Sequence, residues 1–285
     1  MHMTRGPDNR IRPVSDAGLV VLYAFTGVAL IGFATFGLHP NLLAQYPQFA
    51  GFYSISFNFF AQAQIWLAGA ILALFLTAEI GPRWIAAFAT LYLISLGSEL
   101  LGTGTGIPFG DYRYTEALGA KWFGHVPVVI PLSWFFMAVP SYALARWIIP
   151  RQPIGRVMLA SLLLLGWDLA LDPAMSAATT YWVWEEPGAY HGMPWLNLFG
   201  WYITGLMLMG ALALLRSDEW MKGLRLRWLV GFYGANLLLP VGMSVLAGLW
   251  SAVLATVTVL ALVALAAGAV RWRRPAGDEV AGVTA

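Results

Sequence analysis

Long apolar runs alternate with short polar segments along most of this 285-residue chain. Each run is close to the about 20 residues with which an α-helix crosses the hydrocarbon core of a bilayer. The pattern predicts eight spans, at residues 18–38, 59–78, 84–101, 126–149, 154–171, 195–215, 228–246 and 248–270. The predicted fold is therefore all-α, a polytopic transmembrane helical bundle. We expect a single membrane-embedded domain over residues 1–285, with a bundle at 18–270 between short tails at 1–17 and 271–285.

Two stretches are less clear from the pattern. Residues 228–270 carry no charge, but one helix of that length would overshoot the bilayer, so we place a turn near Gly242, Ser244 and Gly248. The uncharged first loop, residues 41–58, fits either the membrane interface or a segment that re-enters the bilayer. The periodicity of its side chains does not decide between these two placements.

Composition supports a membrane protein. Hydrophobic residues make up 59% of the chain and charged residues 11%, which is too little polar surface to cover a soluble core. Cysteine is absent, which excludes disulfides, thiolate nucleophiles and iron–sulfur ligation. The first apolar run lacks a small-residue cleavage pattern, so we interpret it as a retained span rather than a signal peptide.

Basic residues alternate between loops as the positive-inside rule requires. Fourteen of the sixteen lie in the tails and in the loops that eight spans would place on the cytoplasmic side, and only Arg113 and Lys121 lie opposite. Both termini are therefore predicted to be cytoplasmic, in a multi-pass protein of the cell membrane. The other end of the bundle is acidic, with Glu99, Asp111, Glu116, Asp168, Asp172, Glu185 and Glu186.

The segment from Glu99 to Tyr114 is rich in glycine. It lacks the preceding strand and the following Gly-Lys-Ser/Thr of a phosphate-binding loop, which makes a nucleotide site a weak interpretation. The simpler interpretation is a helix that ends at Gly102 and is followed by a turn. That interpretation leaves Glu99, an acid inside an apolar span, unexplained.

Asp168 and Asp172 lie four residues apart near the end of the fifth predicted span, so they share one face of a helix. Two carboxylates that close in a low dielectric cannot both ionise easily, which makes the pair a candidate acid. A purely structural role is the alternative for Asp172, which directly precedes Pro173 and can end the helix. Asp168 lies well inside the span, where ionisable residues mark functional sites.

The third notable segment is the loop at residues 181–197. Its tryptophans fit an aromatic belt at the lipid headgroups, which is the bland interpretation for Trp182 and Trp195. The loop also holds two acids, a histidine, a tyrosine and an asparagine, more than a belt requires. We therefore interpret it as the lid of a pocket.

Several chemistries are unsupported by the residues present. No histidine pair occurs at helical spacing on a span, no lysine lies within a span, and no Gly-x-Ser-x-Gly motif occurs. Carboxylates and aromatic residues remain. They suit acid chemistry on an apolar molecule from the bilayer, such as protonation of an isoprenoid double bond, because aromatic faces stabilise a tertiary carbocation. A second carboxylate would orient the attacking water.

A set of short motifs in order resembles the integral-membrane carotenoid hydratases, which include the γ-carotene and bisanhydrobacterioruberin hydratases. The motifs span the central third of the chain, and they are Glu99, the Gly102–Tyr114 stretch, Val126-Pro127, residues 130–134, Asp168, Asp172-Pro173, the Gly188–Pro194 run, Asn197 and Gly200-Trp201. The resemblance implies that water is added across the terminal double bond of an acyclic carotenoid end group, which gives a tertiary alcohol. It implies no cofactor, no metal and no nucleic acid.

The expected catalytic residues are Asp168 as proton donor, Asp172 as its partner or the base, and Glu99 as a supporting carboxylate. The sequence does not exclude the reverse assignment of donor and base, since coupled carboxylates titrate as a pair. Residues expected to bind water or substrate are Asp111, Tyr112, Tyr114, Trp134, Trp167, Trp184, Glu185, Tyr190 and Asn197. The expected partners are a carotenoid such as γ-carotene or lycopene, the lipid bilayer and other enzymes of the carotenoid pathway.

Two other functions remain open at this point. A membrane prenyltransferase also uses acidic helix ends and isoprenoid substrates, but it needs magnesium and cationic side chains for a diphosphate. The acidic end of this chain offers only Arg113 and Lys121. A proton-coupled transporter of small solutes would also place acids inside the membrane, although the two halves of the chain show no convincing repeat of the kind many transporters have.

Overall fold

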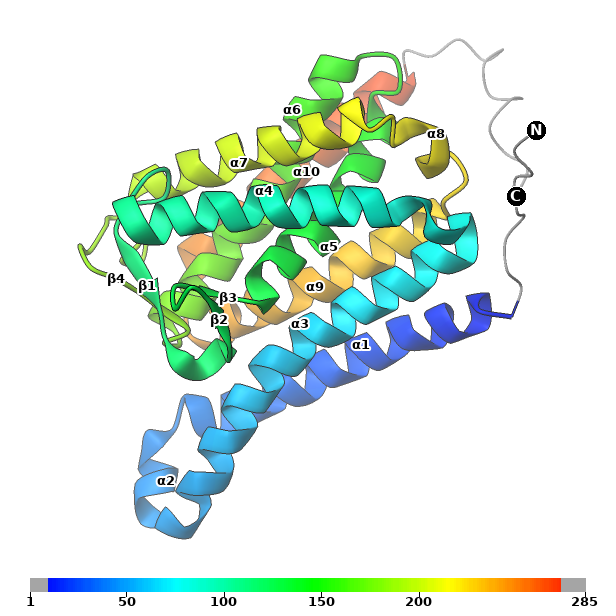
Figure 1. Ribbon diagram of the computed structural model, residues 1–285. Helices are drawn as coiled ribbons and strands as arrows, with labels where there is room; N and C mark the ends of the chain where they lie inside the picture. The colour runs from blue at the N-terminus through cyan, green and yellow to red at the C-terminus, as the bar shows by residue number, and fades with distance from the viewer. Residues whose placement is uncertain (1–9, 273–285) are drawn as a thin grey trace.

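The computed structural model describes residues 10–272, which form a bundle of long helices (Figure 1). Eight helices of this part of the chain have 20 or more residues, and each overlaps one predicted span. They are α1 (Arg12–Gly32), α3 (Ala50–Ile80), α4 (Trp84–Thr105), α5 (Val129–Ile148), α6 (Pro153–Asp172), α7 (Trp195–Leu214), α9 (Leu226–Leu246) and α10 (Trp250–Trp272). The predicted all-α class is confirmed.

Within residues 10–272, seven helical segments are long and apolar enough to cross a membrane, judged by length and composition. The longest, Pro47–Thr105, contains both α3 and α4. These two helices are separated by the 3-10 turn η3 (Gly81–Arg83), where Gly81 has a φ of 67° that favours glycine. The segment is therefore two antiparallel helices, which accounts for the difference between seven segments and eight helices.

The remaining elements are short and lie mostly in the loops. They are η1 (Phe33–Gly37), α2 (Pro40–Gln45), η2 (Pro47–Phe49), β1 (Tyr112–Tyr114), η4 (Glu116–Leu118), β2 (Lys121–Trp122), β3 (Val126–Pro127), η5 (Pro173–Ala177), β4 (Trp182–Trp184) and α8 (Asp218–Met221). β1 pairs with β4 and β2 with β3, both antiparallel. All four strands lie at the same end of the bundle (Figure 1).

Three predicted helix ends need correction. α1 begins at Arg12, inside the segment expected to be a tail, because Pro13 is well suited to the first turn of a helix. α4 continues to Thr105, beyond the expected end at Gly102, and stops at Gly106 with a φ of 73°. α3 begins at Ala50, nine residues before the predicted start of the second span.

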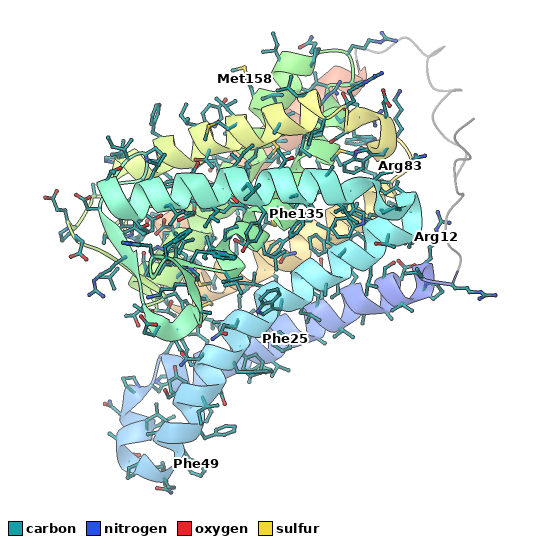
Figure 2. All side chains as sticks on the ribbon, in the orientation of Figure 1. Arg12, Phe25, Phe49, Arg83, Phe135 and Met158 are labelled. Atoms are coloured by element: carbon teal, nitrogen blue, oxygen red, sulfur yellow. The ribbon has the colours of Figure 1, made fainter. Side chains whose placement is uncertain are left out.

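The first loop is mostly helical. α2 and η2 occupy most of its first half and the start of α3 forms the second half, and this segment projects beyond the neighbouring helices (Figure 1). Phe49, labelled at its tip in Figure 2, is 51% exposed, and Phe52 and Ile55 are about 70% exposed. Exposed side chains of this kind are suited to contact with lipid.

The two ends of the bundle differ in charge as predicted. Arg12 and Arg83, labelled in Figure 2, lie at the end where α1 begins and α10 finishes, whereas the four strands lie at the other end. We call these the basic end and the strand end. Which end faces the cytoplasm stays a prediction. Most of the predicted tails, with Arg5, Arg273 and Arg274, lies outside the described residues.

α5 is the central helix of the bundle. It packs against α3, α4, α6, α7 and α9, and nearly all of its side chains are buried, including Phe135 and Tyr142. Its first turns, at the strand end, carry Ser133 and Trp134. The most enclosed helix of the molecule therefore reaches the acidic segments that the sequence singled out.

Candidate functional site

Glu99 is buried on α4, with 3% of its surface exposed. Its Oε2 atom accepts hydrogen bonds from the hydroxyls of Tyr112 and Tyr114, the second at 2.8 Å. Its Oε1 atom accepts one from the indole nitrogen of Trp134 at 2.9 Å. All three donors are neutral, so the environment stabilises a carboxylate without cancelling its charge.

Asp172 is the last residue of α6 and is 2% exposed. Its Oδ1 atom accepts hydrogen bonds from the indole nitrogens of Trp182 at 3.0 Å and Trp184 at 3.3 Å, and lies 3.1 Å from the hydroxyl of Ser176. The amide nitrogen of Asn197 donates to Oδ2 at 2.6 Å. Asp172 therefore also has neutral donors only, and it is more than the end of a helix.

The pairing of β1 with β4 places these donors. In their antiparallel register Tyr112 lies opposite Trp184 and Tyr114 opposite Trp182. Alternate residues of a strand face the same side, so all four aromatic rings point toward the bundle while Arg113 points away. This two-stranded ribbon holds Glu99 through its tyrosines and Asp172 through its tryptophans.

Glu99 and Asp172 line one small cavity of about 30 Å³. That volume suffices for a water molecule. Aromatic rings make up much of its wall: Phe109, Tyr112, Tyr114, Trp134, Trp182, Trp184 and Trp201. The rings of Trp134 and Trp201 are stacked with centroids 3.9 Å apart. A cation formed in this small cavity would lie against several ring faces and two carboxyl groups.

A second, large cavity of about 910 Å³ adjoins the small one. Ile130, Ser133, Leu171 and Trp182 line both cavities. The large cavity extends between α1, the projecting first loop, α3, α6 and α9, and no Asp, Glu, Lys, Arg or His of the described residues lines it. It is therefore suited to a long apolar ligand whose end reaches the small cavity.

Asp168 lies one turn before Asp172 on α6 and is fully buried. Neither of its carboxyl oxygens has a hydrogen-bond partner in the described part of the chain. It lines neither the small nor the large cavity. The two aspartates thus lie one turn apart on α6, as predicted, but only Asp172 reaches the small cavity.

The structure brings some of the other predicted residues to the site and leaves others outside it. Trp134, Trp184, Tyr112, Tyr114 and Asn197 line the small cavity, whereas Trp167 lines the large one. Asp111 and Glu185 are exposed, and the side chain of Glu185 pairs with Arg113 at 3.0 Å. Tyr190 is half-buried and its hydroxyl donates to the backbone oxygen of Leu169 at 2.8 Å.

Six residues that line the small cavity are not among the site residues predicted from the sequence: Phe109, Ile130, Ser133, Leu171, Trp182 and Trp201. The belt interpretation offered for Trp182 does not account for its indole nitrogen, which donates to Asp172. Phe109, Ser133 and Trp201 lie within the motifs that carry the family resemblance, but the motifs alone indicate no role for them. The alternation of Tyr112-Arg-Tyr114 and Trp182-Val-Trp184 was a signal of paired strands that could have identified Trp182.

The tyrosines of the ribbon are held in their neutral form. Burial raises the pKa of Tyr112 and Tyr114 well above the usual value, and the nearby Glu99 raises both further. Burial raises the pKa of Tyr190 to about 12, with smaller contributions from Asp168 and Asp172. These phenols therefore act as hydrogen-bond donors at neutral pH.

The donor set does not resemble that of a metal site. Among residues 10–272, no group of three or more His, Cys, Asp or Glu side chains is arranged to hold a metal ion. The carboxyl oxygens of Glu99 and Asp172 instead accept hydrogen bonds from indole, phenol or amide groups. The arrangement is suited to moving protons beside an apolar ligand.

Fold and site together define an integral-membrane protein with a buried acid site that opens onto an apolar cavity. The sequence profile of a family described as carotenoid biosynthesis protein matches residues 60–263. Because the match covers well over half of the chain, this protein belongs to the carotenoid biosynthesis protein family. The resemblance predicted from the motifs is confirmed, and Glu99, Asp168 and Asp172 all lie within the matched residues.

One curated relative is bisanhydrobacterioruberin hydratase from Haloarcula japonica, with 29% identity over 192 residues. The aligned region is 66% of this chain and 60% of the relative, so the chain spans about three fifths of the relative's length. No solved structure matches the chain.

Proposed function

We propose that this protein is a carotenoid hydratase that adds water to the terminal double bond of an acyclic carotenoid end group. The observation that carries the proposal is the position of Glu99 and Asp172 on one aromatic-walled small cavity that adjoins a large apolar cavity. The family and the hydratase relative support the same class of reaction. In this proposal the polyene lies in the large cavity and its end group reaches the edge of the small one, where the two cavities share lining residues.

The reaction needs an acid, a base and protection for a cation. The acid transfers a proton to the less substituted carbon of the terminal double bond, which leaves a tertiary carbocation on the other carbon. The rings around the small cavity stabilise that charge. Water then adds to the cation and gives one proton to the base, so the product is a tertiary alcohol and no cofactor is required.

We assign the acid to Asp172 and the base to Glu99. Trp182, Trp184 and Asn197 are placed to stabilise the negative charge that Asp172 acquires when it gives up its proton. Glu99, with Tyr112, is placed to accept the proton that the water releases. The sequence favoured Asp168 as donor, but Asp172 is the aspartate that lines the small cavity.

The prenyltransferase alternative is less well supported. A diphosphate would need cationic side chains near the acids, and none lines either cavity in the described part of the chain. Lys121 and Arg113, the two bases at the strand end, pair with Glu116 and Glu185. We therefore expect activity to survive treatment with EDTA.

The decisive experiment is expression of the full chain in a bacterium that makes lycopene or γ-carotene. Extracts should contain a carotenoid heavier than its precursor by one water, detected by liquid chromatography and mass spectrometry. An empty vector and an Asp172→Asn variant serve as controls. If neither carotene yields a hydrated product while the protein is present in the membrane, the proposal is wrong.

A further inference from the structure

Asp168 stands out among the buried acids of the molecule. Four carboxyl side chains are buried in residues 10–272: Glu79, Glu99, Asp168 and Asp172. Glu79 pairs with two arginines, and Glu99 and Asp172 accept hydrogen bonds from neutral donors. Asp168 alone has no partner for either oxygen. Burial of an ionised carboxylate without a partner is costly, so this position accommodates a neutral carboxylic acid.

Asp168 cannot act on the substrate directly, because it lines neither cavity. The four-residue spacing instead places it one helical turn from Asp172 on the same face of α6. Any chemical role of its proton therefore passes through Asp172.

Loop residues lie between the turn of α6 that holds Asp168 and the surface of the strand end. Tyr190 donates to the backbone oxygen of Leu169, the residue that follows Asp168. The ring of Tyr190 lies 5.1 Å from that of His191, whose Nε2 atom is 2.7 Å from the hydroxyl of Ser251 in an exposed position. Polar groups thus extend from the surface to the turn of α6 that holds Asp168.

The proposed hydration requires a group that can return a proton to Asp172. Each cycle leaves Asp172 ionised and Glu99 protonated, although the overall reaction consumes no proton. Before the next cycle Asp172 must regain a proton, and Glu99 must release one. Both changes must occur in an aromatic cavity that has little room for water.

We propose that Asp168 is a positioning residue, which acts on the reaction only through Asp172. It holds the proton that returns Asp172 to its acid form after each turnover. This inference rests on the proposed hydratase function. In it, the proton passes from the Asp168 carboxylic acid to the Asp172 carboxylate when a water molecule or a side-chain rotation bridges the two groups, which are not hydrogen-bonded to each other in the structure. Asp168 then regains a proton from the strand end, along the side where Tyr190 and His191 lie. Direct donation to the substrate remains with Asp172.

The test separates the first turnover from those that follow. Purified full-length protein is placed in liposomes with an excess of lycopene, and hydrated product is counted per protein molecule over time. Asp168→Asn should form about one product molecule per protein at nearly the wild-type rate, after which turnover should slow about 100-fold. Asp168→Glu, which keeps the acid, should recover part of the later rate.

A matched control is Thr204→Val. Thr204 is also fully buried with an unpartnered hydroxyl, but it carries no exchangeable acid and lines neither cavity. This variant should keep both the first and the later rates. A thermal melt in detergent should show that Asp168→Asn remains folded.

The outcomes distinguish the proposals. If Asp168→Asn loses the first turnover as completely as the later ones, Asp168 is a donor or a structural residue, and the inference is overturned. Unchanged later turnover would overturn it equally. If the wild-type protein hydrates neither lycopene nor γ-carotene, the proposed function itself fails and the inference falls with it.

Discussion

The two ends of this bundle treat buried acids in opposite ways. At the basic end, Glu79 is held by Arg12 at 2.7 Å and by Arg225 at 2.8 Å, and the partly exposed Asp218 likewise contacts two arginines, Arg146 and Arg156. At the strand end, Glu99 and Asp172 have only neutral donors. An arginine neutralises a carboxylate and fixes it in place, whereas a phenol or an indole orients it and leaves its charge available.

The acids at the two ends also join different elements of the fold. Glu79 lies on α3 and joins it to α1 and α9 through its two arginines, so the ion pairs hold three helices together. Asp172 and Glu99 instead belong to α6 and α4 and are bridged by the β1–β4 ribbon around the small cavity. The residue type is similar at both ends, so the proposed division between an acid that stabilises the fold and an acid that takes part in chemistry rests on the partners of each acid.

The largest expected effect comes from Asp172→Asn. The amide keeps the shape of the side chain but cannot donate the proton that starts the reaction, so hydration should fall about 1000-fold or more. The measurement is hydrated carotenoid per unit of membrane-inserted protein in lycopene-producing cells. Activity within tenfold of wild type would remove Asp172 from the role of acid.

Glu99→Gln and Glu79→Gln form a matched pair that tests the comparison of the two ends directly. Glu99→Gln should lower hydration about 100-fold and leave the melting temperature nearly unchanged, because its donors are neutral. Glu79→Gln should keep the activity of the folded protein but lose about 3 kcal/mol of stability, because two arginines lose their shared partner.

Activity assays and thermal melts of both variants in the same detergent check this contrast. The loss expected for Glu79→Gln is at the lower end of the range for buried ion pairs, since Arg12 and Arg225 are about a third exposed. Equal losses of stability in the two variants would contradict the distinction between the two ends.

Trp184→Phe should have a smaller effect. The ring stays available to a cation, but Asp172 loses the indole donor at 3.3 Å. We expect hydration to fall about tenfold, which corresponds to one charge-assisted hydrogen bond. Trp195→Phe is the control, because Trp195 is 61% exposed and lines neither cavity. Turnover should fall in Trp184→Phe and stay at the wild-type level in Trp195→Phe, while both variants are expressed to the same level.

The smallest effect concerns pH. Tyr112 and Tyr114 have pKa values raised above the usual value of about 10, so they remain neutral donors as pH rises to that value. A phenol with a raised pKa loses its proton only at a higher pH. We therefore expect no loss of activity from these residues between pH 7 and 10. Turnover in liposomes across this range checks the prediction, and a decline that Tyr114→Phe abolishes would contradict it.

Local pattern was sufficient for the helices and insufficient for the site. Each of the eight long helices overlaps a predicted span, including the last pair, where only Gly242, Ser244 and Gly248 indicated a turn. The alternation Tyr112-Arg-Tyr114 after Glu99 is compatible with a strand, but it does not indicate which segment that strand pairs with. Its partner strand lies some 70 residues away in sequence, at Trp182–Trp184.

The sequence by itself determined the membrane-embedded helical class, the charge difference between the two ends and the acids that needed an explanation. Hydropathy and charge act over windows of about 20 residues, so they can be read along the chain. Only the tertiary structure decided that Glu99 and Asp172 share the small cavity while Asp168 is set apart. That arrangement depends on contacts among α4, α6 and the β1–β4 ribbon, and it cannot be derived from the residue spacing within one helix.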